Sequence, residues 1–220
     1  MAKQTRDFTK TGKVRIMKLV AFFIRHGETD LNKSDSFRGD IDIPLNEEGQ
    51  KQAEEIPHYL AAYKLSSLFH SGMQRTAQTL EPLAEAKGLP SKKMENLDSL
   101  DTGNFAGLPK TEENRKKLEH YRKNPEETIP GGESVQEFRD RIDPLIFNII
   151  KLGEESGAPS AACVHGSVIR EISRLFDESY DSLKVDPGGI IGVFKTQDGY
   201  EVQPLVKENN EQEDMDAPGS

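Results

Sequence analysis

The segment that decides the fold reads LVAFFIRHGET, residues 19–29. Its first six residues form an unbroken apolar run, which is typical of a strand buried on both faces of a parallel sheet. The run ends at Arg25, His26 and Gly27. Open α/β sheets bind ligands beyond the carboxyl ends of their strands, so the segment places a cation and an imidazole where a ligand would lie.

Around this segment, strand-like and helix-like stretches alternate along the chain. Two further strands are expected at 65–70 and 161–164, and helices are expected at about 46–63, 73–86, 134–149 and 168–176. Segments 190–195 and 200–206 read as an antiparallel pair around a turn. Ser134 opens a capping box, and Pro144 is expected to kink the helix that follows or to reset its start. The alternation predicts a three-layer α/β/α sandwich with a mostly parallel central sheet.

The predicted domain spans residues 17–206, which is a suitable length for one α/β unit. Residues 1–16 are polar and basic and are expected to form a flexible tail, and residues 207–220 are acidic and are expected to be disordered. Between these ends, a loop-rich, cap-like segment covers about 96–132. It contains a charged stretch at 111–123, whose basic residues either lie on a solvated helix face or border the ligand pocket.

The bulk composition narrows the function classes. The 220 residues carry a net charge of −9, which disfavours nucleic-acid and membrane partners and requires a local cluster of cations to attract an anionic substrate. The one cysteine, Cys163, cannot form an internal disulfide, and no apolar run is long enough to span a bilayer. With no signal-like N-terminus, the chain is expected to be cytoplasmic.

A second histidine-glycine pair, His165-Gly166, follows the strand expected at 161–164, and Arg75 follows the strand expected at 65–70. These strands are expected to share one sheet edge, so Arg25, His26, Arg75 and His165 should converge there. Guanidinium groups bind phosphate oxygens in a bidentate fashion, and the sequence therefore predicts an anion site at this edge.

Taken in order, these motifs resemble the histidine phosphatase superfamily, which includes the cofactor-dependent phosphoglycerate mutases. The resemblance covers about residues 17–206 and is carried by Arg25 to Thr29 with Asn32, Phe37 to Gly39, Asp42 to Leu45, Gly49 to Ala53, Ser71 to Leu80, Gly131 to Ser134, and Val164 to Gly166. It implies a phosphoglycerate mutase-like fold.

The same resemblance implies a role for each matched residue. His26 would be the nucleophile that becomes phosphohistidine, and Arg25, Arg75 and His165 would hold the transferred phosphoryl group. The remaining substrate contacts would come from Asn32, Arg38, Gly39 and Gly166. No metal ion or other cofactor is expected, because the arginines would supply the positive charge.

The chain departs from the family at the proton donor for the leaving group. Many relatives have a glutamate four residues before the first glycine of a GxxxG segment, and that position is Ser99 here, ahead of Gly103. Asp101 is the preferred substitute, and Asp98 is the alternative. For either carboxylate, a local hydrogen bond to the backbone is the competing interpretation.

We therefore expect a phosphatase that acts on small phosphorylated metabolites, because the segment between the acid region and the GGES motif is short and leaves water access to the phosphohistidine. A phosphoglycerate mutase and a phosphate-binding pseudoenzyme are the alternatives. The sequence does not select the natural substrate, and it is compatible with a monomer or a homodimer.

Overall fold

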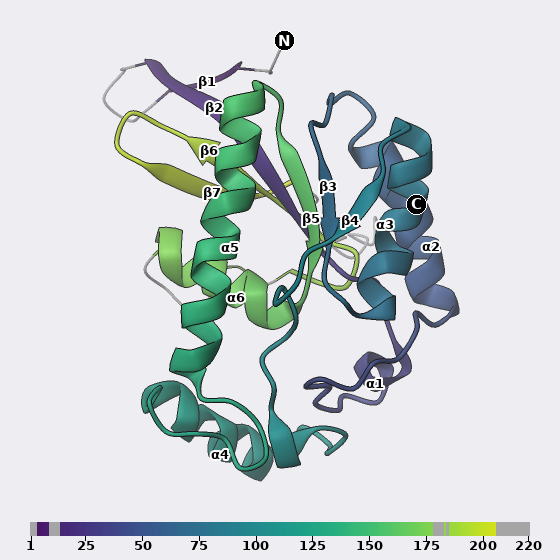
Figure 1. Cartoon of the computed structure of the whole chain (residues 1–220), viewed down its shortest axis with the longest axis vertical. Helices are drawn as coiled ribbons and strands as arrows, with labels where there is room; N and C mark the ends of the chain where they lie inside the picture. The colour runs from purple at the N-terminus through teal and green to yellow at the C-terminus, as the bar shows by residue number, and fades with distance from the viewer. Residues whose placement is uncertain (1–3, 9–13, 178–182, 184, 206–220) are drawn as a thin grey trace, which may run out of the picture.

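The computed structural model describes residues 4–8, 14–177, 183 and 185–205. Their strands form a sheet in the order β4-β3-β5-β2-β6-β7, and β1 pairs with β2 outside this path (Figure 1). The strands β2, β3, β4 and β5 run parallel, while β6 is antiparallel to both β2 and β7. Helices cover both faces, and the sheet is mostly parallel, as the sequence predicts.

The strands are β1 (Gln4–Phe8), β2 (Val14–Arg25), β3 (Leu68–His70), β4 (Ser91–Lys93), β5 (Ser160–Val164), β6 (Ile190–Lys195) and β7 (Tyr200–Pro204). The helices are α1 (Asp30–Lys33), α2 (Glu47–Tyr59), α3 (Gln74–Lys87), α4 (Glu112–Lys123), α5 (Val135–Ser156) and α6 (Gly166–Asp177), with a short 3₁₀ turn at Gly103–Phe105. The elements that were not predicted, β1, α1, β4 and the 3₁₀ turn, are all five residues or shorter.

Strand β2 divides the core into two halves, because its side chains alternate between the two faces of the sheet. Phe22 and Ile24 pack with apolar residues of α2 and α3, such as Ile56 and Leu80. Phe23 packs on the other face, in a cluster with residues of α5 and α6. The central strand is therefore buried on both sides, which explains its unbroken apolar run.

The N-terminal segment differs from the predicted flexible tail. Residues Gln4–Phe8 form β1, which pairs antiparallel with the start of β2 from Val14 to Lys18. Backbone pairing to an existing strand needs no apolar side chains, so the polar composition of this segment did not reveal it. The predicted acidic tail at 207–220 lies outside the described residues.

Helix α5 begins where its capping box predicts, with Ser134 Oγ accepting from Glu137 N and Glu137 accepting from Ser134 N. It then continues through Pro144 without a break up to Ser156. Pro144 is exposed, so solvent can satisfy the carbonyl that loses its partner. The prediction of a new helix start at Pro144 was therefore wrong.

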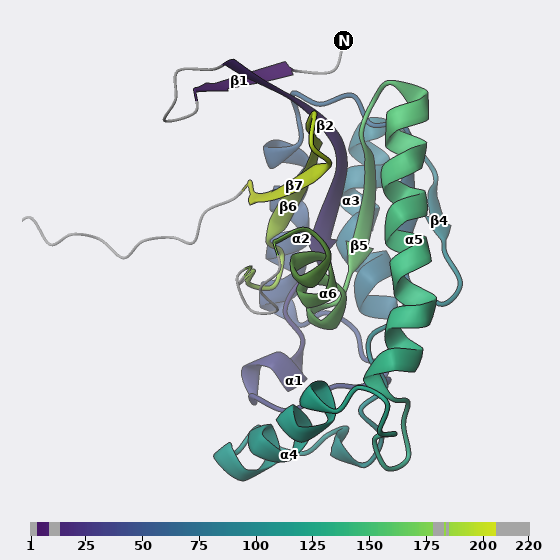
Figure 2. The same cartoon turned by 90° about the vertical axis from the view of Figure 1, so that its left-hand side faces the viewer.

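Helices α1 and α4 lie at the sheet's carboxyl edge, with α4 beyond the end of α5 and α1 at about the level of that end in both views (Figures 1 and 2). Leu118 anchors α4 in the core. On its exposed side, Lys116 and Lys117 pair with Glu112 and Glu113 one turn earlier, at 2.6 Å in each case. These pairs favour the solvated-face interpretation of the basic stretch.

Candidate active site

His26 stands at the end of β2, in a loop that several elements hold in place. Its backbone N–H donates to Val164 O of β5 at 3.0 Å. Gly27 N donates to Thr79 Oγ1 of α3 at 2.9 Å. A Cβ on Gly27 would lie 2.6 Å from the carbonyl oxygen of Gly49, at the start of α2. Only glycine permits this close approach, which sets the imidazole against the sheet edge.

The imidazole of His26 is fully buried, and its two nitrogens have different surroundings. The Nδ1 atom lies 2.7 Å from Gly27 O. Because a carbonyl can only accept, Nδ1 carries the proton and Nε2 presents its lone pair. Among the described residues Nε2 has no hydrogen-bond partner. Burial, followed by the charge of Arg38, holds the pKa of His26 well below its ordinary value, so the ring stays neutral.

Two arginines, one at the end of β2 and one in α3 just after β3, face the same locus. Arg75, in the first turn of α3, is fully buried, and Nη1 donates to Ile41 O at 2.7 Å. Arg25 donates from Nη1 to Val185 O at 2.6 Å. Arg75 Nε and Nη2 and Arg25 Nε are buried without a partner in the described part of the chain. Burial lowers the pKa of Arg75 and, together with the charge of Arg170, lowers that of Arg25 to about 10.

His165 completes this group from the end of β5. Its ring centroid lies 5.4 Å from that of His26. Ser71 Oγ is 2.8 Å from His165 Nε2 and 2.9 Å from Thr76 Oγ1, which fixes the orientation of the ring. The buried Nδ1 atom has no partner among the described residues. Burial, then the charge of Arg75, keeps the pKa of His165 well below its ordinary value.

Arg38 lies on the loop between α1 and α2 and supplies a third cation. Its charge is the largest charge effect on the pKa of His26, and burial lowers its own pKa to about 9, assisted by the charges of Arg25, Arg75 and Arg170. The sequence predicted a contact from the backbone near Arg38, whereas the side chain itself enters the field of the site. Gly39 follows with φ +53°, and a Cβ there would lie 2.6 Å from Thr102 Oγ1.

The other two predicted binding residues lie in different settings. A Cβ on Gly166 would be 3.5 Å from Arg25 Nε, so this glycine forms part of the wall beside the arginine. Asn32 Oδ1 accepts from Thr29 N at 3.1 Å and from Thr29 Oγ1 at 2.9 Å, which caps α1. A contact between Asn32 and substrate stays a prediction.

The candidate proton donors are both engaged with the backbone. Asp101 Oδ1 accepts from Gly103 N at 2.8 Å. Asp98 Oδ1 accepts from Gly72 N at 3.0 Å, and its charge raises the pKa of Arg75 against the effect of burial. Ser99, in contrast, lies 3.0 Å from Ser167 through its Oγ. Of the two carboxylates, Asp98 is the one whose charge acts on a residue of the anion site.

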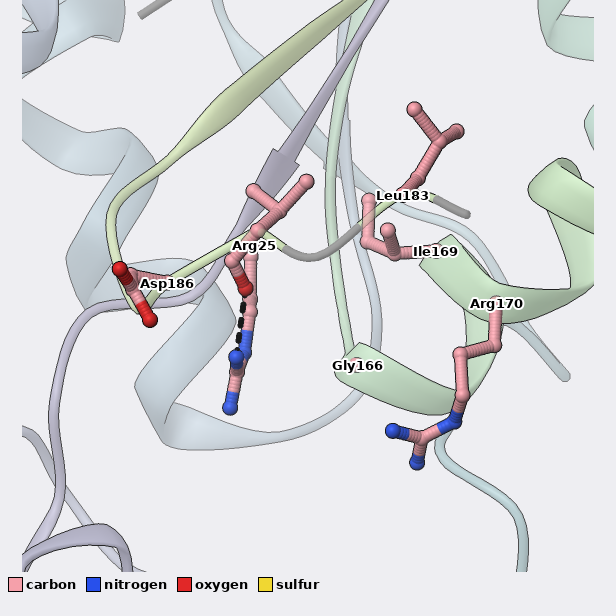
Figure 3. Close-up of a pocket in the computed structure, with 7 residues that line it drawn as sticks. Arg25, Gly166, Ile169, Arg170, Leu183 and Asp186 are labelled. Carbon is pink, nitrogen blue, oxygen red and sulfur yellow. Dashed lines mark hydrogen bonds between the residues drawn. The ribbon is translucent and has the colours of Figure 1, made fainter. Parts of the chain in front are cut away.

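A cavity of about 230 Å³ opens beside Arg25 and is lined by Arg25, Gly166, Ile169, Arg170, Leu183, Val185 and Asp186. In Figure 3, Arg25 lies to the left of Gly166 and Arg170 to its right, and both guanidinium groups lie in the lower half of the view. Sequence reasoning missed Arg170. Its spacing of four from Gly166 was the available signal, because residues four apart share a helix face.

Sequence reasoning also missed Arg141 of α5, which braces the loop that carries the candidate donors. Its guanidinium donates to Ser99 O and Asp98 O at 2.9 and 3.1 Å and forms an ion pair with Glu133. Within the described residues, no three His, Cys, Asp or Glu side chains are grouped as metal ligands. No helix in the same part of the chain has the length and apolarity required to cross a membrane.

The chain is similar to curated proteins named as phosphatases and as phosphoglycerate mutases. The curated relatives include an uncharacterized phosphatase, PhoE, of Bacillus subtilis (strain 168), 33% identical over 119 residues, which are 54% of this chain and 58% of the relative. A probable phosphoglycerate mutase, GpmB, of Salmonella choleraesuis (strain SC-B67) is 30% identical over 63% of this chain and 66% of its own. The chain thus spans less than two thirds of the length of each of these relatives.

Among solved structures, a mycobacterial glucosyl-3-phosphoglycerate phosphatase in complex with VO3 has a TM-score of 0.70 at 21% identity, over 86% of this chain and 98% of that one. This likeness concerns the fold. The model of the histidine phosphatase superfamily (branch 1) matches residues 21–203. The match spans the strand ends that carry both histidines, and the chain therefore belongs to the histidine phosphatase superfamily.

Proposed function

We propose that the protein is a phosphatase that hydrolyses phosphate monoesters through a phosphohistidine on His26. The observation that carries the proposal is that Nε2 of a neutral His26 lies among buried nitrogens of Arg25, Arg75 and His165, and that within the described residues none of these atoms has a hydrogen-bond partner. Fixed donors in a water-poor site stabilise charge on a phosphoryl group more effectively than they would in water.

In the first step, Nε2 of His26 attacks phosphorus, and the bond between phosphorus and the leaving oxygen breaks. The proton on Nδ1 stays hydrogen-bonded to Gly27 O, which favours the positive charge that develops on the ring. Donors on Arg25, Arg75 and His165 receive the three terminal oxygens as the phosphoryl group moves. In the second step, water attacks the phosphohistidine, and the electron pair of the P–N bond returns to Nε2.

An alkoxide leaving group needs a proton, and Asp101 and Asp98 are the candidate donors for esters. Replacing the true donor with asparagine should slow esters with poor leaving groups far more than p-nitrophenyl phosphate. Asp101→Asn and Asp98→Asn, each assayed with both kinds of substrate, separate the two residues.

Phosphoglycerate mutase activity is the second candidate, and the similarity to a probable phosphoglycerate mutase favours it. The two functions differ in the fate of the phosphoryl group on His26. With 3-phosphoglycerate and a trace of bisphosphoglycerate, a mutase forms 2-phosphoglycerate, whereas a phosphatase releases inorganic phosphate or leaves the substrate unchanged.

The direct test is a rapid quench during turnover of p-nitrophenyl phosphate. An acid-labile, base-stable phosphoryl group on the wild-type protein, absent from His26→Ala, supports the proposal. Turnover without such an intermediate, or its retention in His26→Ala, would contradict it.

A further inference from the structure

The active site separates into two sets of donors. Arg25 Nε, Arg75 Nε and Nη2, and His165 Nδ1 come from the strand ends β2, β3 and β5 and the start of α3, and they suffice for three terminal phosphoryl oxygens. Two other buried polar atoms without a partner in the described residues, Arg38 Nη1 and Thr102 Oγ1, come from loops instead.

These two loops are joined to each other and form one wall. The loop of Arg38 bonds to the cap-like segment through Phe37 N to Leu108 O at 2.9 Å and Gly107 N to Phe37 O at 2.8 Å. Thr102 also meets this loop, because its Oγ1 lies 2.6 Å from where a Cβ of Gly39 would be. Arg38 therefore reaches the reacting phosphoryl group from the cap side, where the rest of the substrate has to lie.

The positive charges near Arg38 call for a second anionic group in addition to the phosphoryl group that is transferred. The charged groups that shift the pKa of Arg38 are all arginines, namely Arg25, Arg75 and Arg170. Asp42 and Asp98 act on Arg75 instead, and Asp186 acts on Arg25. A buried guanidinium amid like charges is costly unless an anion neutralises it.

The candidate acids lie in settings that do not mark either of them as a proton donor, and the two histidines are dominated by positive charge. The largest charge effects on the pKa of His26 come from Arg38, His165 and Arg75, and those on the pKa of His165 come from arginines. Asp101 is turned to Gly103 N, and Ser99 bonds with Ser167. A leaving group beside this wall would contact the cation Arg38 and hydroxyl groups.

We propose that Arg38 binds the leaving group, and that this group is itself a phosphate, so that the preferred substrates are phosphoric anhydrides such as nucleoside diphosphates. The inference rests on the phosphohistidine function proposed above and names its substrate class. A phosphate leaving group is stable as an anion near neutral pH and needs no protein acid, and the guanidinium fork fits its oxygens.

The reaction balances without a further reactant besides water. His26 Nε2 attacks the terminal phosphorus, the bridging P–O bond breaks, and its electron pair leaves on the second phosphate, beside Arg38. Water then attacks the phosphohistidine, the P–N electron pair returns to Nε2, and the protons of water go to the released phosphate and to solvent.

The test compares a nucleoside 5′-diphosphate, the corresponding 5′-monophosphate and p-nitrophenyl phosphate. The wild-type protein should prefer the diphosphate over the monophosphate by about 100-fold in kcat/KM, the scale of a missing general acid. Arg38→Gln should lower kcat/KM for the diphosphate about 100-fold and for p-nitrophenyl phosphate less than about tenfold. Arg38→Lys should retain part of the preference, because it keeps the charge and loses the fork.

Lys51→Gln serves as the matched control, because it removes one positive charge from the exposed face of α2. An equal or better rate with the monophosphate, or an unchanged diphosphate preference in Arg38→Gln, would overturn the proposal. Failure of the phosphatase function is a separate result: p-nitrophenyl phosphate would then give no His26-dependent turnover at all.

Discussion

Two clusters of buried charge, one between α5 and α6 and one at the sheet edge, are organised in opposite ways. Between the helices, the fully buried Glu171 pairs with Arg139 at 3.3 Å and with Arg174, and Arg174 also pairs with Asp143 at 2.7 Å. Positive and negative groups alternate there, and each charge has a counterpart on the other helix. The cluster therefore holds α6 against α5.

At the sheet edge, no salt bridge within the described residues joins these cations to a carboxylate, although Asp186 and Asp42 act on Arg25 and Arg75 at longer range. Arg25, Arg38 and Arg75 gather around His26, and each lowers the pKa of at least one other member of the group. Their unpartnered donors cost folding free energy, which is recovered when an anion binds. Balanced charge stabilises the fold, whereas unbalanced charge marks the ligand site, and four predictions test this distinction.

The largest effect is expected for His26→Ala, which removes the nucleophile and leaves the guanidinium donors in place. Turnover of p-nitrophenyl phosphate should fall by at least about 10⁴-fold, while vanadate or phosphate binding measured by calorimetry persists. His120→Ala is the matched control, since His120 is exposed on α4 and bonds to Glu127. Retained turnover in His26→Ala would remove His26 from the mechanism.

The sequence predicted the main elements of the fold because long apolar periods and caps are local signals. The run 19–24 forms the C-terminal half of β2, and Asn46 and Ser134 cap α2 and α5 where expected. Strand β1 was missed because it is held by backbone pairing, and β4 because three polar residues carry no periodic pattern.

The site was predicted less completely than the fold. Strand ends placed Arg25, His26, Arg75 and His165 at one edge, since parallel strands share that edge. The side chain of Arg38 was not foreseen as a cation of the site, because a loop between two helices has no periodicity that orients it. Arg141 holds the loop of the candidate donors through Glu133 and backbone carbonyls. It lies far from that loop in the sequence, so no local pattern indicates the contact.

The balanced cluster predicts the largest effect on stability. Glu171→Gln leaves Arg139 and Arg174 without their shared carboxylate, so the free energy of unfolding should fall by about 3 kcal/mol in urea titrations. Glu155→Gln, at an exposed pair with Lys151 on α5, is the control and should change it by less than about 0.5 kcal/mol. Equal effects of the two substitutions would show that the α5–α6 cluster does not hold the helices together.

The unbalanced cluster predicts how stability depends on pH. His26 and His165 have native pKa values well below their ordinary value, so below about pH 6.5 the unfolded chain binds protons that the native protein does not. Their stabilising contribution is therefore complete above that pH and declines as the pH falls, by about 2 kcal/mol between pH 7 and 5.5.

Urea titrations across this range measure the decline. Replacing both histidines with asparagine should flatten the profile between these pH values. Saturating phosphate should also reduce the slope, because a bound anion favours the protonated rings in the native state. A wild-type profile as flat as that of the double variant would show that the two rings are not buried in neutral form.

The last prediction concerns the smallest effect but gives the sharpest comparison. Replacement of an arginine by glutamine should change the free energy of unfolding in opposite directions in the two clusters. Arg38→Gln removes a buried cation surrounded by like charges, and the free energy of unfolding should rise by about 1 kcal/mol in phosphate-free buffer. Arg139→Gln removes a partner of the buried Glu171, and the same quantity should fall by about 1 kcal/mol or more. Added phosphate should narrow the advantage of Arg38→Gln, because the wild-type protein binds the anion more tightly and gains more from it. If Arg38→Gln instead lost stability as Arg139→Gln does, Arg38 would belong with the charges that hold the fold, and its role in ligand binding would have to be abandoned.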